Sequence, residues 1–128
     1  IGYDLYSDGE YIIKPQKVQL VKLGIAIQLP KNVGGFVLPR SGLASNNLVA
    51  PINAPGLIDP GYTGEQMIPF MNYSKEDYTV IRNERIAQIV TNTTGSISFK
   101  KVGPKRYDAI LSLYSLKSSD AGWKIETY

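Results

Sequence analysis

The feature that most limits the fold of this chain is the regular recurrence of Gly, Pro and Asn between short apolar runs. The runs return roughly every 8 to 12 residues, which is the spacing of strands in a sandwich or a barrel. No helical periodicity extends beyond one turn, and the sequence has no internal repeat. The pattern therefore predicts an all-β fold with at most one short helix.

Several strands are predicted from alternation and from the residues that bound them. Residues 25–29 alternate Ile, Ile and Leu with Ala and Gln, so we expect a half-buried strand that ends at the next proline. The apolar run 67–71 contains Pro69, which predicts an edge strand or a bulge because proline cannot donate to a ladder. Residues 41–47 lack alternation, and Ser41 is a suitable N-cap for one short helical turn. Other strands are expected at residues 11–13, 18–21, 36–38, 78–81, 86–90 and 97–99.

The pattern weakens after Gly103-Pro104. We therefore expect a β-barrel over residues 1–102 and a C-terminal tail over residues 103–128. Within the tail, the apolar spacing of residues 107–116 is compatible with a helix.

Composition places the chain among globular domains. At 128 residues it is long enough for one domain with a proper core, and no apolar run approaches the roughly 18 residues of a membrane helix. The absence of cysteine excludes disulfides and thiolate metal sites and fits a reducing, intracellular environment.

The absence of histidine restricts the chemistry further. It removes the usual general base near neutral pH, the Ser and Cys triads, and His-ligated metals. Catalysis would depend on carboxylates, hydroxyls, Tyr, Lys and Arg, and a metal would be a hard cation with oxygen ligands. The net charge of +3 suits an anionic small substrate, and we expect the basic cluster within residues 100–106 to be a solvated rim rather than a nucleic-acid site.

Residues 53–65 hold the strongest local signal. Pro60 and Gly61 predict a type II turn over Asp59-Pro60-Gly61-Tyr62, because proline fixes φ at the first central position and glycine tolerates positive φ at the second. A rigid turn that carries one carboxylate and one ring is suited to a small site on a β scaffold, although it is also compatible with an ordinary surface turn.

Two further segments carry polar groups at strand ends. Arg40-Ser41-Gly42 combines a guanidinium, a hydroxyl and an exposed amide, which together suit a phosphate. Arg85 and Gln88 are three apart on a predicted strand, so we expect them on opposite faces. Asp4 is a single acid in a Tyr-rich strand, for which a structural hydrogen bond is the simpler explanation.

Four segments resemble, in order, motifs of the trimeric dUTP nucleotidohydrolase (dUTPase) family. They begin at Gly2, Pro39, Gly56 and Arg85, with the sequences GYDLYS, PRSGLA, GLIDPGYTG and RIAQ. The resemblance implies a distorted jelly-roll or β-barrel and a dUTP diphosphatase that forms dUMP and pyrophosphate. It also implies a homotrimer with active sites at subunit interfaces. From the residues themselves we expect no membrane partner and no nucleic-acid partner.

The resemblance also implies residue roles. Asp59 would deprotonate the water that attacks the α-phosphorus, and Tyr62 would exclude a 2′-hydroxyl. Uracil would be recognised by Asn53 and by backbone groups of the hairpin, and the phosphate chain would be held from the second and fourth motifs. Asp4 would orient hydrated Mg²⁺ through water. The implied substrate-binding residues are Arg40, Ser41, Gly42, Asn53, Gly56, Ile58, Tyr62 and Gln88.

The chain departs from the family pattern at both ends. The family's fifth motif, an Arg, a glycine-rich run and a stacking Phe, is not evident, and residues 117–123 are its nearest counterpart, so reduced activity is expected. The first motif begins at once and without an initiator Met, so we expect the chain to be part of a longer protein.

Three alternatives stay open. A dCTP deaminase shares the barrel but carries a catalytic Glu where this chain has Pro69. A non-catalytic nucleotide-binding or regulatory module would fit the missing fifth motif. A basic nucleic-acid-binding barrel would need aromatic residues interleaved with Lys and Arg, and only Tyr107 adjoins the basic cluster.

Overall fold

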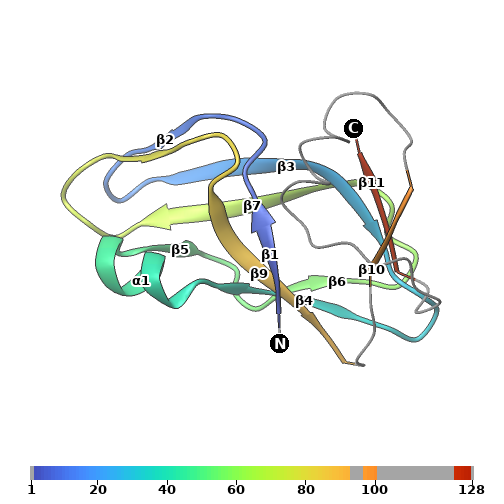
Figure 1. Cartoon of the computed structure of the whole chain (residues 1–128). Helices are drawn as coiled ribbons and strands as arrows, with labels where there is room; N and C mark the ends of the chain where they lie inside the picture. The colour runs from blue at the N-terminus through green and yellow to red at the C-terminus, as the bar shows by residue number, and fades with distance from the viewer. Residues whose placement is uncertain (1, 93–96, 101–122, 128) are drawn as a thin grey trace. The chain divides into compact units, whose positions relative to one another are not determined.

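The computed structural model describes residues 2–92, 97–100 and 123–127 (Figure 1). These residues form eleven strands and one helix, which confirms the predicted all-β fold. No helix in this part of the chain is long and apolar enough to span a membrane. The elements are β1 (Tyr3–Tyr6), β2 (Tyr11–Ile13), β3 (Val18–Gln28), β4 (Gly35–Pro39), α1 (Ser41–Asn47), β5 (Val49–Pro51), β6 (Gly56–Ile58), β7 (Glu65–Asn72), β8 (Tyr78–Val80), β9 (Arg85–Thr91), β10 (Ile97–Lys100) and β11 (Trp123–Thr127).

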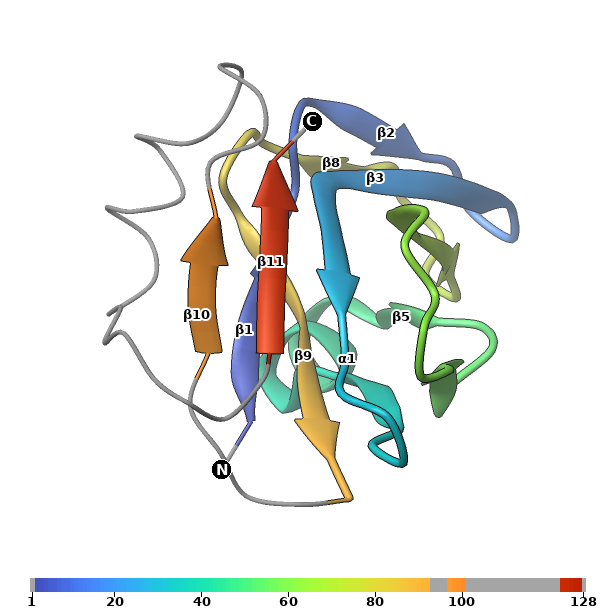
Figure 2. The ribbon, with the colours of Figure 1, turned by 90° about the vertical axis from the view of Figure 1, so that its right-hand side faces the viewer.

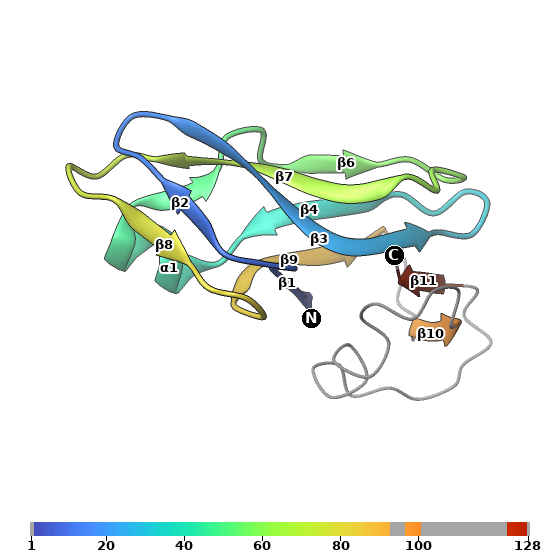
Figure 3. The same cartoon turned by 90° about the horizontal axis from the view of Figure 1, so that it is seen from above.

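The described strands form three sheets. One has the order β1-β9-β4-β6, a second has the order β10-β11-β3-β7-β5, and β2 pairs with β8. Figure 2 shows β10 and β11 side by side and parallel, and β11 is also antiparallel to β3. Figure 3 shows the antiparallel β2–β8 pair, in which Ile12 lies opposite Thr79.

The chain divides into two compact units. The first comprises residues 1–23, 36–56 and 67–90, and the second comprises residues 24–35, 57–66 and 91–128. The core of the first unit includes Leu5, Ile13, Val21, Phe70, Ile86 and Ile89, and the second buries Ile25, Ile27 and Ile58.

The structure corrects the expected burial of the third strand. β3 is continuous from residue 18 to residue 28, and its residues 23–27 are all buried. The strand predicted for residues 25–29 is therefore present as far as Gln28, but its predicted half-burial is wrong at Ala26. Hydrophobic alternation underestimates burial here because Ala26 is small enough to be buried on the face assigned to solvent.

Pro69 is also placed differently from the prediction. β7 is not an edge strand, because it lies between β3 and β5. Pro69 directly precedes Phe70, which pairs with Pro51 at the end of the β5 ladder. The carbonyl oxygen of Pro69 accepts the Ile52 N–H at 2.8 Å. In a hydrogen-bonded antiparallel pair, each residue donates its N–H to the carbonyl of the other. The N–H that Pro69 lacks would therefore have pointed to Ile52, beside β5. Proline therefore ends the β5 ladder and leaves the pairing with β3 intact.

The helix begins at Ser41, the residue predicted to cap it, so the observed cap lies one residue earlier than the prediction. Arg40 is the N-cap residue, with extended backbone angles and no side-chain capping bond, and Ser41 is the first residue of α1. The prediction that Ser41 caps the helix is therefore wrong. The helix ends at Leu48, which has a left-handed backbone conformation at φ 56° and donates its N–H to the carbonyls of Ala44 and Leu43.

Part of the predicted tail is a strand. Trp123–Thr127 forms β11, which the sequence did not reveal. The possible helix at residues 107–116, and all of residues 117–122 of the fifth-motif counterpart, lie outside the described residues.

Candidate functional site

The candidate site residues belong to two groups, one in each compact unit. Those of the first unit lie on or beside β1, β4, β9 and α1 or between β5 and the start of β6. Those of the second are Ile58, at the end of β6, and the turn that follows it.

The first group begins with a β-bulge between β1 and β9. Asp4 lies opposite Gln88 and Leu5 opposite Ala87, but Tyr6 lies opposite Arg85, so Ile86 is the extra residue. Ile86 and Ala87 are consequently both buried. Because the bulge interrupts the alternation, the side chains of Arg85 and Gln88 are not on opposite faces, and that prediction is wrong.

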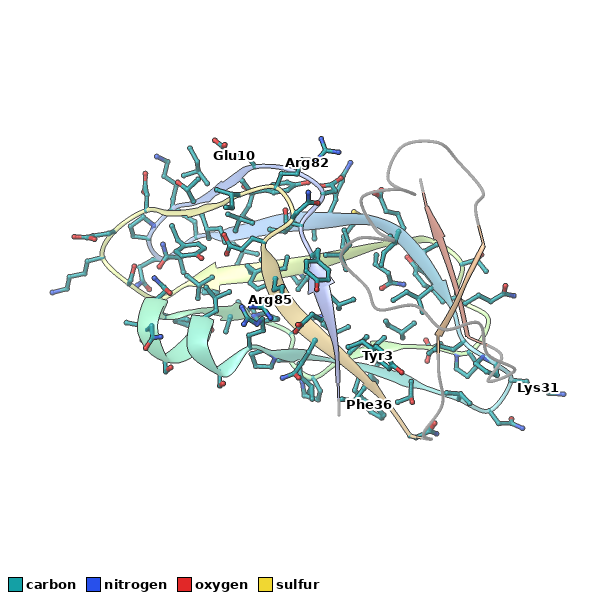
Figure 4. The ribbon with its side chains drawn as sticks, viewed as in Figure 1. Tyr3, Glu10, Lys31, Phe36, Arg82 and Arg85 are labelled. Carbon is teal, nitrogen blue, oxygen red and sulfur yellow. The ribbon has the colours of Figure 1, made fainter. Side chains whose placement is uncertain are left out.

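Arg85 reaches back across the bulge to Asp4. Its Nη1 lies 3.4 Å from Asp4 Oδ2, in a partly exposed ion pair. Figure 4 labels the Arg85 side chain. Cross-strand partners share a face, so Asp4, Gln88 and the guanidinium of Arg85 gather on one side of the β1–β9 pair. This contact also gives Asp4 the structural bond that the sequence predicted.

Arg40 joins this group from the end of β4. Its Nη1 donates to the carbonyl oxygen of Arg85 at 2.9 Å. One N–H of the guanidinium is thereby fixed, while the planar group retains several further donors. Arg40, at the start of α1, thus contacts Arg85, which pairs with Asp4, so this group of two arginines and one carboxylate has net positive charge.

Gln88 contacts the backbone directly before Arg40. Its Nε2 donates to the carbonyl oxygen of Pro39 at 3.1 Å, directly before Arg40. Its Oε1 lies over Gly2, where an added Cβ would be only 2.8 Å away. The Gln88 amide is therefore packed between β4 and the start of the chain, and it holds the backbone that leads into α1.

Ser41 and Gly42 form the exposed first turn of α1. The first N–H groups of a helix have no intrahelical acceptor, and here the first bond formed is Ala44 N–H to the Arg40 carbonyl. The turn therefore presents backbone donors beside the Arg40 guanidinium.

Asn53 and Gly56 adjoin each other after β5. The Nδ2 of Asn53 lies 3.3 Å from where a Cβ of Gly56 would be, so the amide covers the Gly56 backbone. Asn53 is exposed and Gly56 is buried.

Tyr6 shows the electrostatics of this group. Burial, and secondly the Asp4 carboxylate, raise the pKa of Tyr6, while Arg85 and Arg40 oppose the shift. The phenol is therefore neutral at physiological pH, and neither arginine is neutralised by it.

The second group is the turn over residues 59–62, which the structure confirms. The Tyr62 N–H donates to the Asp59 carbonyl at 3.1 Å, and Gly61 has φ +84°, as a type II turn requires. Asp59 is exposed, and Tyr62 keeps 47% of its surface exposed. Ile58 is buried, so only its backbone is available to a ligand.

The described residues contain no cluster of three or more acidic side chains that could enclose a metal. Mg²⁺ in nucleotide enzymes is usually held by one or two carboxylates, water and substrate phosphates rather than by an all-protein cage. Asp4, whose side chain is 35% exposed, fits this role as a partner of a hydrated ion.

The sequence indicated these site residues through motif spacing but did not show how they connect. Asp8 and Tyr11, which the motifs did not include, are linked by a 2.6 Å hydrogen bond from the Tyr11 hydroxyl. Tyr78 and Glu84 are linked in the same way at 2.6 Å. No sequence signal identifies such pairs, because each depends on how turns bring side chains together.

Comparison with known proteins gives a consistent family. The dUTPase family model matches residues 1–118. The deoxyuridine 5′-triphosphate nucleotidohydrolase of Clostridioides difficile is 42% identical over 101 residues, which are 79% of this chain and 71% of that protein. The protein of the same name from Tropheryma whipplei is 42% identical over 102 residues, 79% of this chain and 70% of its own length.

Solved structures agree on the fold. A mutant dUTPase of phage phi11 of S. aureus has a TM-score of 0.67 at 22% identity, and the match covers 80% of this chain and 83% of that one. The EIAV dUTPase has a TM-score of 0.63 at 28% identity and covers 70% of this chain and 72% of its own.

Proposed function

Because the chain belongs to the dUTPase family, we propose that it hydrolyses dUTP to dUMP and pyrophosphate and so limits the incorporation of uracil into DNA. The observation that carries this proposal is the type II turn over residues 59–62, which holds an exposed carboxylate and an exposed ring at fixed positions. A rigid turn of this kind preorganises the groups that a hydrolytic site needs.

Asp59 is the general base of the proposed reaction. It accepts a proton from a water molecule whose oxygen bonds to the α-phosphorus. The bond between that phosphorus and the oxygen bridging to the β-phosphate breaks, and pyrophosphate leaves with the bonding electrons. Catalysis depends on positioning and charge stabilisation more than on a strong base.

The phosphate chain is bound by the group at the end of β4. Arg40 supplies a charged N–H donor set, and the N–H groups of Ser41 and Gly42 supply neutral donors next to it. Gln88 contributes by holding the Pro39 carbonyl, and its amide is also the proposed partner of a phosphate oxygen.

The nucleoside is recognised by backbone and by shape. Asn53, together with the backbone of Gly56 and Ile58, reads the uracil edge, since fixed backbone donors and acceptors reject the opposite pattern of cytosine. Tyr62 packs on the deoxyribose and leaves no space for a 2′-hydroxyl.

Mg²⁺ is the proposed cofactor. When bound, it would neutralise negative charge on the phosphate oxygens. Asp4 would hold its water shell, while Arg85 keeps the Asp4 carboxylate in place through their ion pair. The mutant dUTPase of phage phi11 of S. aureus coordinates a structural Mg(II) ion, so Mg²⁺ is the metal to test first here.

A homotrimer is the proposed assembly. The first unit exposes apolar side chains on neighbouring strands, Val18 and Leu20 on β3 and Met67 on β7, at 43% to 51% of their surface. A second copy of the chain would cover such side chains and remove them from water.

The test is a comparison of four nucleotides. The protein is incubated with Mg²⁺ and dUTP, dCTP, dTTP or UTP, and pyrophosphate release is measured. We expect release from dUTP and a loss of at least about 100-fold in Asp59→Asn, with nucleotide binding retained. Binding without release from any nucleotide would contradict hydrolysis and support a nucleotide-binding module instead.

A further inference from the structure

Gly64 has a distinctive environment in the second unit. A Cβ at this position would lie 2.5 Å from the Tyr62 Oη, 2.7 Å from its Cζ and 3.2 Å from its Cε2. The first two distances are shorter than real Cβ contacts, so the Tyr62 ring lies directly on the Gly64 backbone.

Backbone conformation does not explain this glycine. Among the described glycines, only Gly24 and Gly61 have positive φ. At Gly61, an added Cβ would meet nothing within 4 Å, so the requirement there is conformational. At Gly64 the requirement is the opposite one, because the backbone tolerates a side chain and the Tyr62 ring does not.

The Tyr62 ring is therefore held at two places. Its own backbone N–H is fixed by the bond to the Asp59 carbonyl, and the far end of its ring lies on Gly64. Because 47% of the residue is exposed, the ring has room to adopt other rotamers once the contact at Gly64 no longer sets its orientation.

We propose that Gly64 is a positioning residue that sets the orientation of Tyr62 and thereby the preference for deoxyribose over ribose. The proposal depends on the proposed function, because it acts through the role of Tyr62 in excluding a 2′-hydroxyl. A methyl group at position 64 displaces the Tyr62 ring from the Gly64 backbone. The displaced ring no longer fills the space that a ribose 2′-hydroxyl would occupy.

The fold should survive this change. The atoms that a Cβ would meet are the end of an exposed side chain and not backbone, so the Tyr62 side chain moves before the backbone at Gly64 does. Gly34→Ala is the matched control, because Gly34 belongs to the same unit, lacks positive φ and has nothing within 4 Å of its Cβ position.

The experiment measures kcat/KM for dUTP and UTP in the wild type, Gly64→Ala, Tyr62→Ala, the double variant and Gly34→Ala. We expect Gly64→Ala to lower the dUTP-to-UTP ratio about tenfold and Gly34→Ala to leave it unchanged. In the Tyr62→Ala background, Gly64→Ala should have no further effect, because coupled residues are not additive. An unchanged ratio in Gly64→Ala, or an equal further fall in the double variant, would overturn the proposal.

The packing itself is tested without activity. Wild-type protein should give a nuclear Overhauser effect between the Tyr62 ring protons and the Gly64 α protons, and its absence overturns the inference whatever the enzyme does. If the wild type hydrolyses neither nucleotide, the proposed hydrolysis fails. Binding of the imido analogues of dUTP and UTP then replaces kcat/KM, with the same expected ratio and the same contrary outcomes.

Discussion

At the scale of single residues, two hydroxyl–carboxylate bonds and two ion pairs are clear, and their surroundings decide what each contributes. Tyr78 donates to Glu84 Oε2, while Glu84 Oε1 accepts the Ile81 N–H at 3.2 Å. Asp4 pairs with Arg85 and Asp77 pairs with Lys14, both at partly exposed positions. The hydrogen bonds to Glu84 order a turn, whereas the two exposed ion pairs contribute little to stability.

Tyr78 should make stability depend on alkaline pH. Burial, and then the bond to Glu84 and its negative charge, raise the pKa of Tyr78 far above its ordinary value. A raised pKa in the folded state stabilises the fold below about pH 10. That contribution is lost as the pH rises above about 10, because only the unfolded tyrosine then ionises. The free energy of unfolding, measured between pH 8 and 11, should therefore fall more steeply with pH above pH 10, and this fall should be smaller in Tyr78→Phe.

Glu84→Gln is the informative companion variant. It removes the charge and keeps an oxygen acceptor, so the Tyr78 pKa falls towards its ordinary value and the alkaline loss of stability becomes smaller. At pH 8 Tyr78→Phe should be destabilised by about 1 kcal/mol through the lost hydrogen bond. Equal alkaline slopes in the wild type and both variants would contradict this account.

Asp4→Asn should affect the metal and not the fold. We expect its unfolding free energy to change by less than about 1 kcal/mol, since its partner is an exposed arginine. The Mg²⁺ concentration for half-maximal dUTP hydrolysis should rise, and chelation by EDTA should abolish hydrolysis in both proteins. Asp77→Asn changes the charge equally at the other ion pair and is the control. An equal Mg²⁺ requirement in both variants would remove Asp4 from the proposed metal site.

At the scale of elements, β7 and β9 each contain a departure from regular pairing. Pro69 ends one ladder of β7, and the extra residue in β9 rotates Arg85 towards Asp4. The bulge changes which side chains share a face, because it places a cation and an amide on one face of a strand on which regular alternation would separate them.

β7 also carries a buried group that costs stability. Gln66 is 7% exposed, and its Nε2 has no hydrogen-bond acceptor within the described part of the chain. Replacing a buried unsatisfied donor with an apolar group of similar size should stabilise the protein by about 1 to 3 kcal/mol. We therefore expect Gln66→Leu to raise the Tm, as measured by calorimetry. Gln66→Glu keeps the shape but buries a charge and should lower it. A lower Tm in Gln66→Leu would show that the amide has a partner.

At the scale of the whole molecule, association is the property to test. The chain of 14.1 kDa exposes apolar side chains in its first unit that solvent does not favour. We expect sedimentation to give a mass three times that of the chain. Leu20→Lys should weaken the assembly, because it places a charge among these side chains. Matched substitution of Lys22→Gln, on the same strand but already polar, should not. A monomer at high concentration would contradict the trimer.

Most of the strands could be predicted from the sequence because their signals are local. Breakers bound the apolar runs, and the 59–62 turn follows from the backbone limits of Pro60 and Gly61. The site residues were indicated by four ordered motifs, not by any contact between them. The strand β11 was missed because it depends on pairing with β10 and β3, and its own five residues carry no local signal for that pairing.

The sequence by itself determined the strand-rich class, the type II turn at Asp59 and the exclusion of histidine chemistry. Each follows from residue type and short-range sterics. Only the tertiary structure decided that Asp4 meets Arg85 from 81 residues away, that Arg40 and Gln88 support one corner, and that Tyr62 lies on Gly64. The first two depend on strand pairing and on one extra residue in β9. The third depends on a side-chain rotamer, because the spacing of Tyr62 and Gly64 does not fix which way the ring turns.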